Sequence, residues 1–269
     1  MAYFMSLYNQ PVDVVIPVFN GANSILAAVN SVLNQKNVLL GNVFIINDGS
    51  TDNTLDVLGF IRDSHIKVIS IPNSGVSYAR NLGISFCNSN WIAFLDADDY
   101  WFESKLYNQL KIANTNQVDF ICGSTGNINR NNDSVINSSS LLLGNYIVTS
   151  SVLMKRQLAH RVESVFNVGL TFAEDYDAWF KLLSISKGYF SSEKLFYYHI
   201  SETPHYKLKD IFFNMLSLEL SCLKFLLNSN LSLFTKFRLF FVLTIGVSFS
   251  FLGIIKRFLI AFGFIKYEK

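Results

Sequence analysis

The 269-residue sequence has few cysteines and lacks two common phosphate-binding patterns. Its three cysteines, Cys87, Cys122 and Cys222, are too far apart in the sequence to match a metal-binding motif. An odd number of cysteines, two of them in apolar segments, predicts buried free thiols and a reducing compartment. No Gly-x-Gly-x-x-Gly follows a strand pattern, and no Gly-Lys-Ser/Thr loop is present. Neither a dinucleotide-binding protein nor a P-loop protein is therefore supported.

What the sequence does contain is an alternation of strand and helix patterns through its first hundred residues. Apolar runs predict strands at 12–20, 43–46, 66–71 and 91–95. Amphipathic spacing predicts one helix that Asn23 opens and another over about 76–87. Four such alternations favour an α/β, Rossmann-like and mostly parallel sheet with its site at the carboxyl ends of the strands.

The fourth predicted strand is followed directly by the acidic cluster Asp96-Ala97-Asp98-Asp99. Carboxylates packed this closely repel one another unless a positive group lies between them. Mg²⁺ and Mn²⁺ prefer oxygen ligands and often share them with phosphates. The cluster therefore predicts a metal–diphosphate site. The alternatives are a solvated acidic turn and, for Asp99, the cap of a helix beginning near Glu103.

A second acidic group, Glu174, Asp175 and Asp177, stands at the start of another predicted helix. Apolar side chains at 176, 179, 180 and 183 follow helical spacing. Acids in the first turn are favoured by the helix dipole. These residues alone therefore require no catalytic role.

Five short motifs occur in a fixed order along the chain. They are Val-Val-Ile-Pro-Val-Phe-Asn at 14–20, Asn-Asp-Gly-Ser-Thr-Asp at 47–52, Asn-Ser-Gly-Val-Ser-Tyr-Ala-Arg-Asn at 73–81, Asp-Ala-Asp-Asp at 96–99 and Glu-Asp at 174–175. Together they resemble a family 2 glycosyltransferase of the GT-A fold, with helices on both faces of its sheet. The resemblance covers roughly residues 10 to 200.

This resemblance implies a metal-dependent, inverting hexosyltransferase of the bacterial surface-polysaccharide type. Its donor would be a nucleotide-diphosphate sugar, with a UDP-sugar expected, and its acceptor a hydroxyl of a saccharide or a lipid-linked sugar. Two other interpretations stay open. The first is a sugar nucleotidyltransferase. Such an enzyme usually has glycines and basic residues after the first strand, whereas residues 17–31 contain no Lys or Arg. The other is a catalytically silent sugar-nucleotide or lipid-binding module on the same fold.

The resemblance assigns the nucleotide to the ends of the first strands. The backbone of Pro17 and Val18, together with Asp48, matches the positions that hold base and ribose. A carboxylate can accept hydrogen bonds from a base N–H or from ribose hydroxyls, although Asp48 could instead cap the next helix. Asn73 and Gly75 resemble the loop beside the nucleotide, where glycine lets the backbone approach a ligand.

The remaining site residues are carried over in the same way. Arg80 is expected to reach ribose or phosphates, with a surface ion pair as the alternative. Asp98 is the expected ligand of Mn²⁺ or Mg²⁺, and Asp96 is expected to touch ribose or a metal-bound water. Asp175 is implied as the general base that takes the proton of the acceptor hydroxyl. Glu174 would orient the acceptor or support Asp175.

The chain departs from the family pattern in two places. The Gln and Trp signature of processive synthases is absent after residue 175, so one sugar per encounter is expected. Members of the family often carry a histidine after the catalytic helix. In this chain either His199 or His205 could take that position, because the spacing departs from the family pattern. Segment 123–140 is rich in Asn, Ser and Gly and predicts a loop or irregular hairpin near the site. Acceptor specificity is expected there and in residues 145–172.

The composition changes near residue 206, which predicts a catalytic domain at 1–205 and a helical tail at 206–269. The tail holds 12 of the 25 phenylalanines and a net charge of +6, against −4 for residues 1–205. Residues 239–255 are uncharged and at the lower limit of spanning length. Basic, aromatic helices lying on an anionic leaflet are favoured. A spanning helix, a helical cap and an oligomer contact are the alternatives.

The N terminus shows no signal-peptide pattern, which favours a cytoplasmic catalytic domain. Together with the tail, this predicts an enzyme peripheral to the inner face of the cell membrane. No nucleic-acid partner is expected.

Overall fold

The computed structural model describes residues 10–124, 132–141, 145–170 and 173–199. Its large sheet has eight strands, in the spatial order β3 (Ile66–Ile71), β2 (Leu40–Asp48), β1 (Val12–Val18), β4 (Trp91–Phe94), β8 (Leu153–Lys155), β6 (Phe120–Ser124), β9 (Gly188–Lys194) and β7 (Ser134–Ile136). Only β8 and β7 run antiparallel to their neighbours. A separate antiparallel pair joins β5 (Tyr100–Trp101) to β10 (Phe196–Tyr197). The predicted mostly parallel α/β sheet is confirmed.

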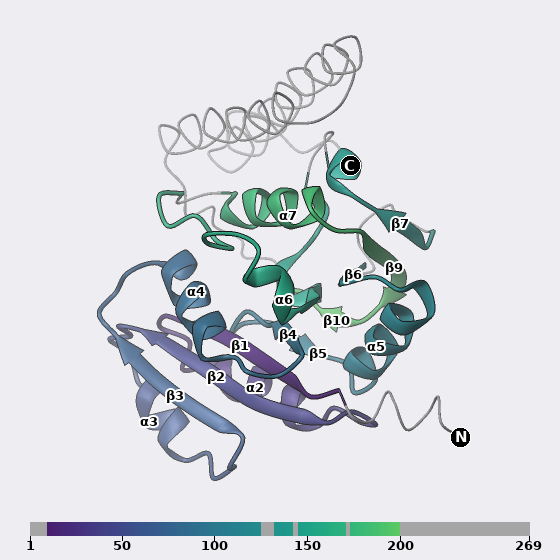
Figure 1. The fold of residues 1–269 in the computed structure, drawn as a ribbon. Helices are drawn as coiled ribbons and strands as arrows, with labels where there is room; N and C mark the ends of the chain where they lie inside the picture. Colours follow the sequence, from purple (N-terminus) through teal and green to yellow (C-terminus); the bar gives the residue numbers. More distant parts are fainter. Residues whose placement is uncertain (1–9, 125–131, 142–144, 171–172, 200–269) are drawn as a thin grey trace, which may run out of the picture.

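Helices cover both faces of the large sheet (Figure 1). One face carries α2 (Ile25–Leu33), α3 (Thr54–Gly59) and α5 (Lys105–Asn116), and the other carries α4 (Val76–Phe86), α6 (Arg156–Ala159) and α7 (Glu174–Ser184). Successive side chains of a strand point to opposite faces. Val14 and Ile16 of β1 accordingly pack in the core under α2, whereas Val15 packs in the core with Ala79 of α4. A strand buried on both faces explains the continuous apolar run in its sequence.

Some boundaries differ from the sequence-based expectation. The first helix begins at Ile25, with Ser24 rather than Asn23 at its N-cap. Within segment 123–140, β7 pairs with β9 and not with β6, so these two strands do not form a hairpin, and residues 125–131 lie outside the described residues. Two short 3₁₀ helices, Ser138–Leu141 and Thr149–Ser151, complete the described elements. The predicted buried free thiols are confirmed for Cys87 and Cys122.

Close packing brings α4 against β1. A Cβ at Gly83 would lie 2.4 Å from Cγ1 of Val15, so only glycine allows this approach.

A buried carboxylate, that of Asp13, lies near the start of β1. Asp13 accepts hydrogen bonds from the backbone N–H groups of Asn42, Asn88 and Ser89 at 2.7 to 2.8 Å. These contacts give Asp13 a structural role on the edge opposite the predicted site.

None of the helices in the described part of the chain is both long and apolar enough to cross a bilayer. The predicted tail at 206–269, including its uncharged segment 239–255, lies outside the described residues. The predicted boundary at residue 205 therefore stays a prediction, as does the role of His205.

Candidate active site

The motifs that follow β1 and β2 are joined by hydrogen bonds. The Asn20 N–H donates to Oγ of Ser50 (2.9 Å), and Oδ1 of Asn20 accepts from the Thr51 N–H (2.8 Å). Asn20 adopts φ 53°, a left-handed conformation that asparagine tolerates better than most residues. These bonds hold the second motif beside the end of the strand that carries Pro17 and Val18.

Asp48 ends β2 and is buried. Its carboxylate accepts hydrogen bonds from the backbone N–H groups of Ser74 (2.7 Å) and Gly75 (2.9 Å), just ahead of α4. Asp48 therefore holds the loop after β3 and does not cap α3, the alternative raised from the sequence. A Cβ at Gly49 would lie 2.7 Å from the backbone nitrogen of Asn73, so the two loops pack closely. The structure thus brings together Asp48, Asn73 and Gly75, as the motifs predict.

Arg80 lies within α4 with only 5% of its side chain exposed. Its Nη1 donates to Oε1 of Glu174 (2.9 Å) and its Nη2 donates to Oδ1 of Asp96 (2.8 Å). The guanidinium also lies over the Phe166 ring, 5.1 Å from its centroid. Burial alone would lower the pKa of Arg80, but the carboxylates of Asp96 and Glu174 more than offset this and raise it.

The ion pair of Arg80 is therefore buried, which corrects the surface ion pair considered from the sequence. It also joins the acidic cluster after β4 to the acids at the start of α7, two motifs separated by almost eighty residues. Both motifs consequently belong to one site.

The three aspartates after β4 have different surroundings. Asp96 binds Arg80 through one carboxylate oxygen, and its backbone N–H donates to Oγ of Ser150 (3.0 Å). Asp98 is exposed, and partial desolvation followed by the nearby Asp96 raises its pKa. Asp99 is buried, and burial raises its pKa to about 7.

Asp99 also accepts a hydrogen bond from the backbone N–H of His199 (2.8 Å). The expected alternative, in which Asp99 caps a helix near Glu103, is wrong because α5 begins at Lys105. The contact follows from the pairing of β5 with β10, which brings residue 199 to the acidic cluster. A charged His199 would lower the pKa of Asp98, although burial and Asp96 raise it by more.

The acidic cluster could supply some, but not all, of the ligands of a cation. Within the ranges that the structure describes, no group of three or more His, Cys, Asp or Glu side chains is arranged to hold a metal ion. Asp98 is the exposed carboxylate of the cluster, while Asp96 already binds Arg80. The oxygen donors suit Mg²⁺ or Mn²⁺. Such an ion would need further ligands from a bound diphosphate or from water.

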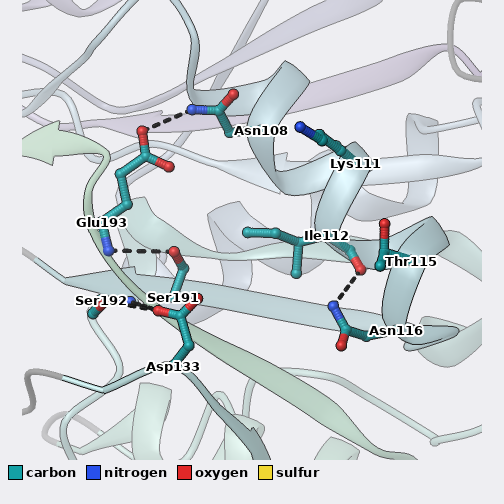
Figure 2. Close-up of a pocket in the computed structure, with 9 residues that line it drawn as sticks. All are labelled: Asn108, Lys111, Ile112, Thr115, Asn116, Asp133, Ser191, Ser192 and Glu193. Atoms are coloured by element: carbon teal, nitrogen blue, oxygen red, sulfur yellow. Dashed lines mark hydrogen bonds between the residues drawn. The ribbon is translucent and has the colours of Figure 1, made fainter. Parts of the chain in front are cut away.

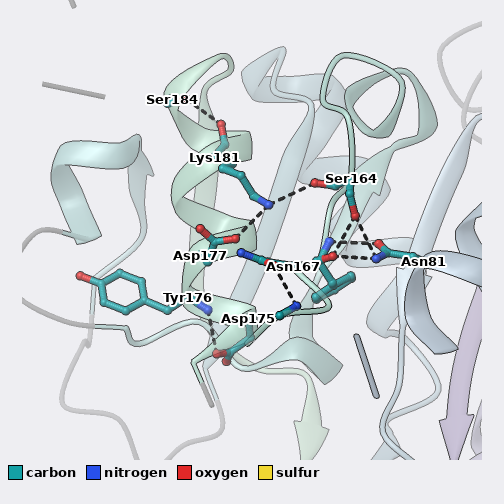
Figure 3. A network of polar contacts seen from close by, with 10 residues as sticks. Asn81, Ser164, Asn167, Asp175, Tyr176, Asp177, Lys181 and Ser184 are labelled. Carbon is teal, nitrogen blue, oxygen red and sulfur yellow. Dashed lines mark hydrogen bonds and ion pairs between the residues drawn. The ribbon is translucent and has the colours of Figure 1, made fainter. Parts of the chain in front are cut away.

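Asp175 lies in the first turn of α7 (Figure 3). Its Oδ1 accepts from the Tyr176 N–H (2.7 Å), and its Oδ2 accepts from Nδ2 of Asn145 (2.9 Å). Burial, followed by the adjacent Glu174, raises the pKa of Asp175 to about 7, whereas Arg80 opposes the shift. A carboxyl that titrates near neutral pH is suited to act as a general base.

Asp177 has a different role from its two acidic neighbours. It is buried and forms an ion pair with Nζ of Lys181 (2.9 Å), which also donates to the carbonyl oxygen of Ser164 (3.1 Å; Figure 3). Asn81 of α4 holds the same loop, because its Nδ2 donates to Ser164 Oγ (3.0 Å) and to the Phe166 carbonyl (2.6 Å). Asp177 and Asn81 thus support the packing of α7 and α4.

The sequence-based reasoning did not single out Asn145, Ser150 or Phe166. Asn145 and Ser150 lie on one connecting segment, 145–151, and contact Asp175 and Asp96 respectively. Their segment has no helical or alternating pattern that could have marked them. The contacts become visible only once the tertiary structure is known.

A hollow of about 550 Å³ lies between α5 and β9 (Figure 2). It shares no residue with the site described above. Its acids are already paired: Asp133 accepts from Ser192 N–H (2.8 Å), and Glu193 accepts from Nδ2 of Asn108 (2.7 Å). We assign it no function.

The sequence matches Glycosyl transferase family 2 over residues 13–169, and the chain belongs to this family. Among curated relatives, UDP-Glc:alpha-D-GlcNAc-diphosphoundecaprenol beta-1,3-glucosyltransferase WfaP of Escherichia coli is 33% identical over 190 residues, which cover 64% of this chain and 70% of WfaP. The chain spans 34% of the length of two uncharacterized glycosyltransferases of Rickettsia species. The predicted family is confirmed.

Solved structures confirm the predicted GT-A fold. TarS 1–349 of S. aureus in complex with UDP-GlcNAc superposes with a TM-score of 0.75 at 19% identity, over 90% of this chain and 73% of that chain. The mannosyltransferase PcManGT of Pyrobaculum calidifontis, in complex with GDP-Man and Mn²⁺, gives 0.62 at 15% identity, over 90% and 74%. At these identities the likeness concerns the fold alone.

Proposed function

We propose that this chain is a metal-dependent, inverting glycosyltransferase that moves a hexose from a nucleotide-diphosphate sugar to a hydroxyl group. The observation that carries the proposal is the buried Arg80, which binds Asp96 on the donor side and Glu174 beside Asp175. Two acidic motifs that the family relates to donor and acceptor thereby face one another in a single site.

We propose a UDP-sugar as the donor. The name of WfaP specifies UDP-Glc, and TarS was solved with UDP-GlcNAc, whereas PcManGT was solved with GDP-Man. The backbone of Pro17 and Val18, with Asp48, Asn73 and Gly75, would hold the base and ribose. Each oxygen of Asp48 accepts one backbone hydrogen bond and can accept a second from a ligand.

The proposed reaction is a single displacement. The acceptor hydroxyl oxygen would bond to the anomeric carbon while the carbon–oxygen bond to the diphosphate breaks, and Asp175 would take the hydroxyl proton. Attack from the face opposite the leaving group inverts the anomeric centre. Mn²⁺ or Mg²⁺ held at Asp98, with Asp96 nearby, would neutralise charge on the departing diphosphate.

We propose a saccharide or lipid-linked acceptor at the inner face of the membrane, in surface-polysaccharide biosynthesis. The acceptor in the name of WfaP is a diphosphoundecaprenol-linked GlcNAc, which supports this choice. The basic and aromatic tail at 206–269 would contact the lipid surface. Equal sedimentation of the full chain and of a 1–205 truncation with anionic vesicles would contradict the membrane role.

Asp175→Asn is the test of the catalytic proposal. It should lower transfer by at least about 100-fold, the usual contribution of a general base, and leave UDP binding by calorimetry unchanged. Asp56→Asn, on the exposed surface of α3, is the matched control. Transfer that survives Asp175→Asn would exclude Asp175 as the base. UDP binding with no turnover on a panel of nucleotide sugars would favour a silent module, and sugar-nucleotide synthesis from a nucleoside triphosphate would favour a nucleotidyltransferase.

A second prediction concerns the metal. Chelation with EDTA should abolish transfer, and Mn²⁺ or Mg²⁺ should restore it. Asp98→Asn should raise the metal concentration for half-maximal rate by roughly tenfold or more, because a ligand is lost. Activity that persists after exhaustive chelation would contradict metal dependence.

A further inference from the structure

Asn145 donates a hydrogen bond to the proposed base from outside its helix. The distance from its Nδ2 to Oδ2 of Asp175 is 2.9 Å. Asn145 comes from the segment that precedes the 3₁₀ helix Thr149–Ser151, whereas Asp175 belongs to α7. The two residues therefore meet only in the folded chain.

The orientation of this amide is fixed by a second hydrogen bond. Oδ1 of Asn145 accepts from the Ile147 N–H at 3.0 Å, and a carbonyl oxygen but not an NH₂ group can accept that bond. The NH₂ group must consequently face Asp175. Ile147 is 1% exposed, so the turn that holds Asn145 is anchored in the core.

Asp175 receives few other stabilising contacts as an anion. Glu174, its neighbour on α7, repels the negative charge, and Arg80 of α4 attracts it while already paired with Glu174 and Asp96. The Tyr176 N–H occupies the other carboxylate oxygen. Within the described ranges, Asn145 is thus the uncharged side chain of another segment that donates a hydrogen bond to this carboxylate.

We propose that Asn145 is a positioning residue for Asp175: its amide fixes the carboxylate in one orientation and favours the ionised form that can accept a proton. The inference rests on the proposed role of Asp175 as the base. Loss of the donor should raise the pKa of Asp175 further, because a hydrogen bond to the charged form would be missing. Less of the base would then be ionised at pH 7, and the lost rate should return at higher pH.

Two variants of the full chain separate this role from a structural one. Asn145→Ala removes both hydrogen bonds. Asn145→Asp keeps an oxygen that accepts from the Ile147 N–H but turns a carboxylate oxygen toward Asp175. Asn116→Ala is the matched control, because Asn116 is exposed and donates within α5 to the Ile112 carbonyl (Figure 2).

The first measurement is a pH titration of ¹³C-labelled aspartate carboxyls by NMR, with the Asp175 signal assigned from its loss in Asp175→Asn. The midpoint should rise by roughly 0.5 to 1 pH unit in Asn145→Ala and by more in Asn145→Asp. It should stay unchanged in Asn116→Ala. An unchanged midpoint in both Asn145 variants would overturn the inference, whatever the activity of the chain.

The second measurement is the release of UDP from UDP-glucose, with water as acceptor, between pH 6 and 9. At pH 7 the rate should fall roughly two- to fivefold in Asn145→Ala, as the smaller ionised fraction requires, and further in Asn145→Asp, and both variants should recover toward wild type at pH 9. An equal loss at every pH would indicate a structural role and count against the inference. If Asp175→Asn retains the wild-type rate, the proposed base fails, while the NMR titration still decides the contact with Asn145.

Discussion

Arg80 holds a buried positive charge between two carboxylates, so its removal should affect the stability of the fold. Arg80→Met would leave Asp96 and Glu174 without their partner in a largely buried site. Breaking a buried ion pair in this way typically costs about 3–5 kcal/mol. We expect a loss near the lower end, about 3 kcal/mol, because the Asp96 side chain is 28% exposed.

Urea unfolding followed by tryptophan fluorescence would measure this loss. Arg80→Lys keeps the charge but cannot reach both acids, and should be intermediate. The control is Arg62→Met, since Arg62 is exposed and, among the residues that the structure describes, donates to the nearby backbone carbonyls of Gly59 and Ile61. A loss for Arg80→Met no larger than for Arg62→Met would show that the ion pair does not stabilise the fold.

At the scale of elements, α4 is fastened to the loop that ends at Phe166. Asn81 donates to two groups of this loop, and its Oδ1 accepts from the Phe166 N–H (3.0 Å). Phe166 is fully buried, and its ring lies against the guanidinium of Arg80. Asn81 therefore supports the site through a neighbouring residue of the same helix.

We predict that Asn81→Ala costs about 1–3 kcal/mol in the free energy of unfolding, because it leaves the Phe166 N–H without its acceptor, while the Phe166 carbonyl keeps its hydrogen bond from Ser164 Oγ (2.8 Å). Chemical denaturation would measure the change. Asn53→Ala is a suitable comparison, because Asn53 is exposed at the start of α3. Equal stability of the two variants would contradict the proposed fastening.

The elements themselves were largely predictable, and the links between them were not. Burial dictates which residue types a strand or a helix carries. The apolar runs therefore predict β1 and β4, and the helical spacing predicts α7. Polar contacts between elements have no comparable sequence pattern. Arg80 could equally have been exposed, and Asp99 could have capped a helix, since the sequence does not reveal which side chain lies nearby. Asn145 and Ser150 were invisible for the same reason.

At the scale of the whole molecule, the raised pKa values of Asp175 and Asp99 should make stability depend on pH. Burial raises the pKa of both carboxyls to about 7 in the folded chain, against about 3.9 when unfolded. Between these values the folded state binds more protons, so the free energy of unfolding should fall as pH rises from 4 to 7. Acids with a lowered pKa, such as Asp52 and Asp63, change the free energy of unfolding only below about pH 4, outside this window.

We therefore predict that the protein is more stable at pH 5 than at pH 8, by roughly 1–4 kcal/mol. Denaturation curves at several pH values would test this. Asp175→Asn and Asp99→Asn, which cannot titrate, should each flatten the dependence. Lys105 is buried and desolvation lowers its pKa, which acts in the opposite direction, so the variants decide the test. A pH dependence that neither substitution changes would show that these carboxyls titrate normally in the folded chain.

Segment 145–151 has a practical consequence for engineering. Its residues Ile147, Thr149, Ser150 and Ser151 are buried, and it touches both acidic motifs through Asn145 and Ser150. Loop grafts intended to redirect which sugar is extended should leave this stretch in place and exchange sequence only on either side of it. A chimera that replaced it would alter the surroundings of the proposed base together with any change in selectivity, and the two effects could not be told apart.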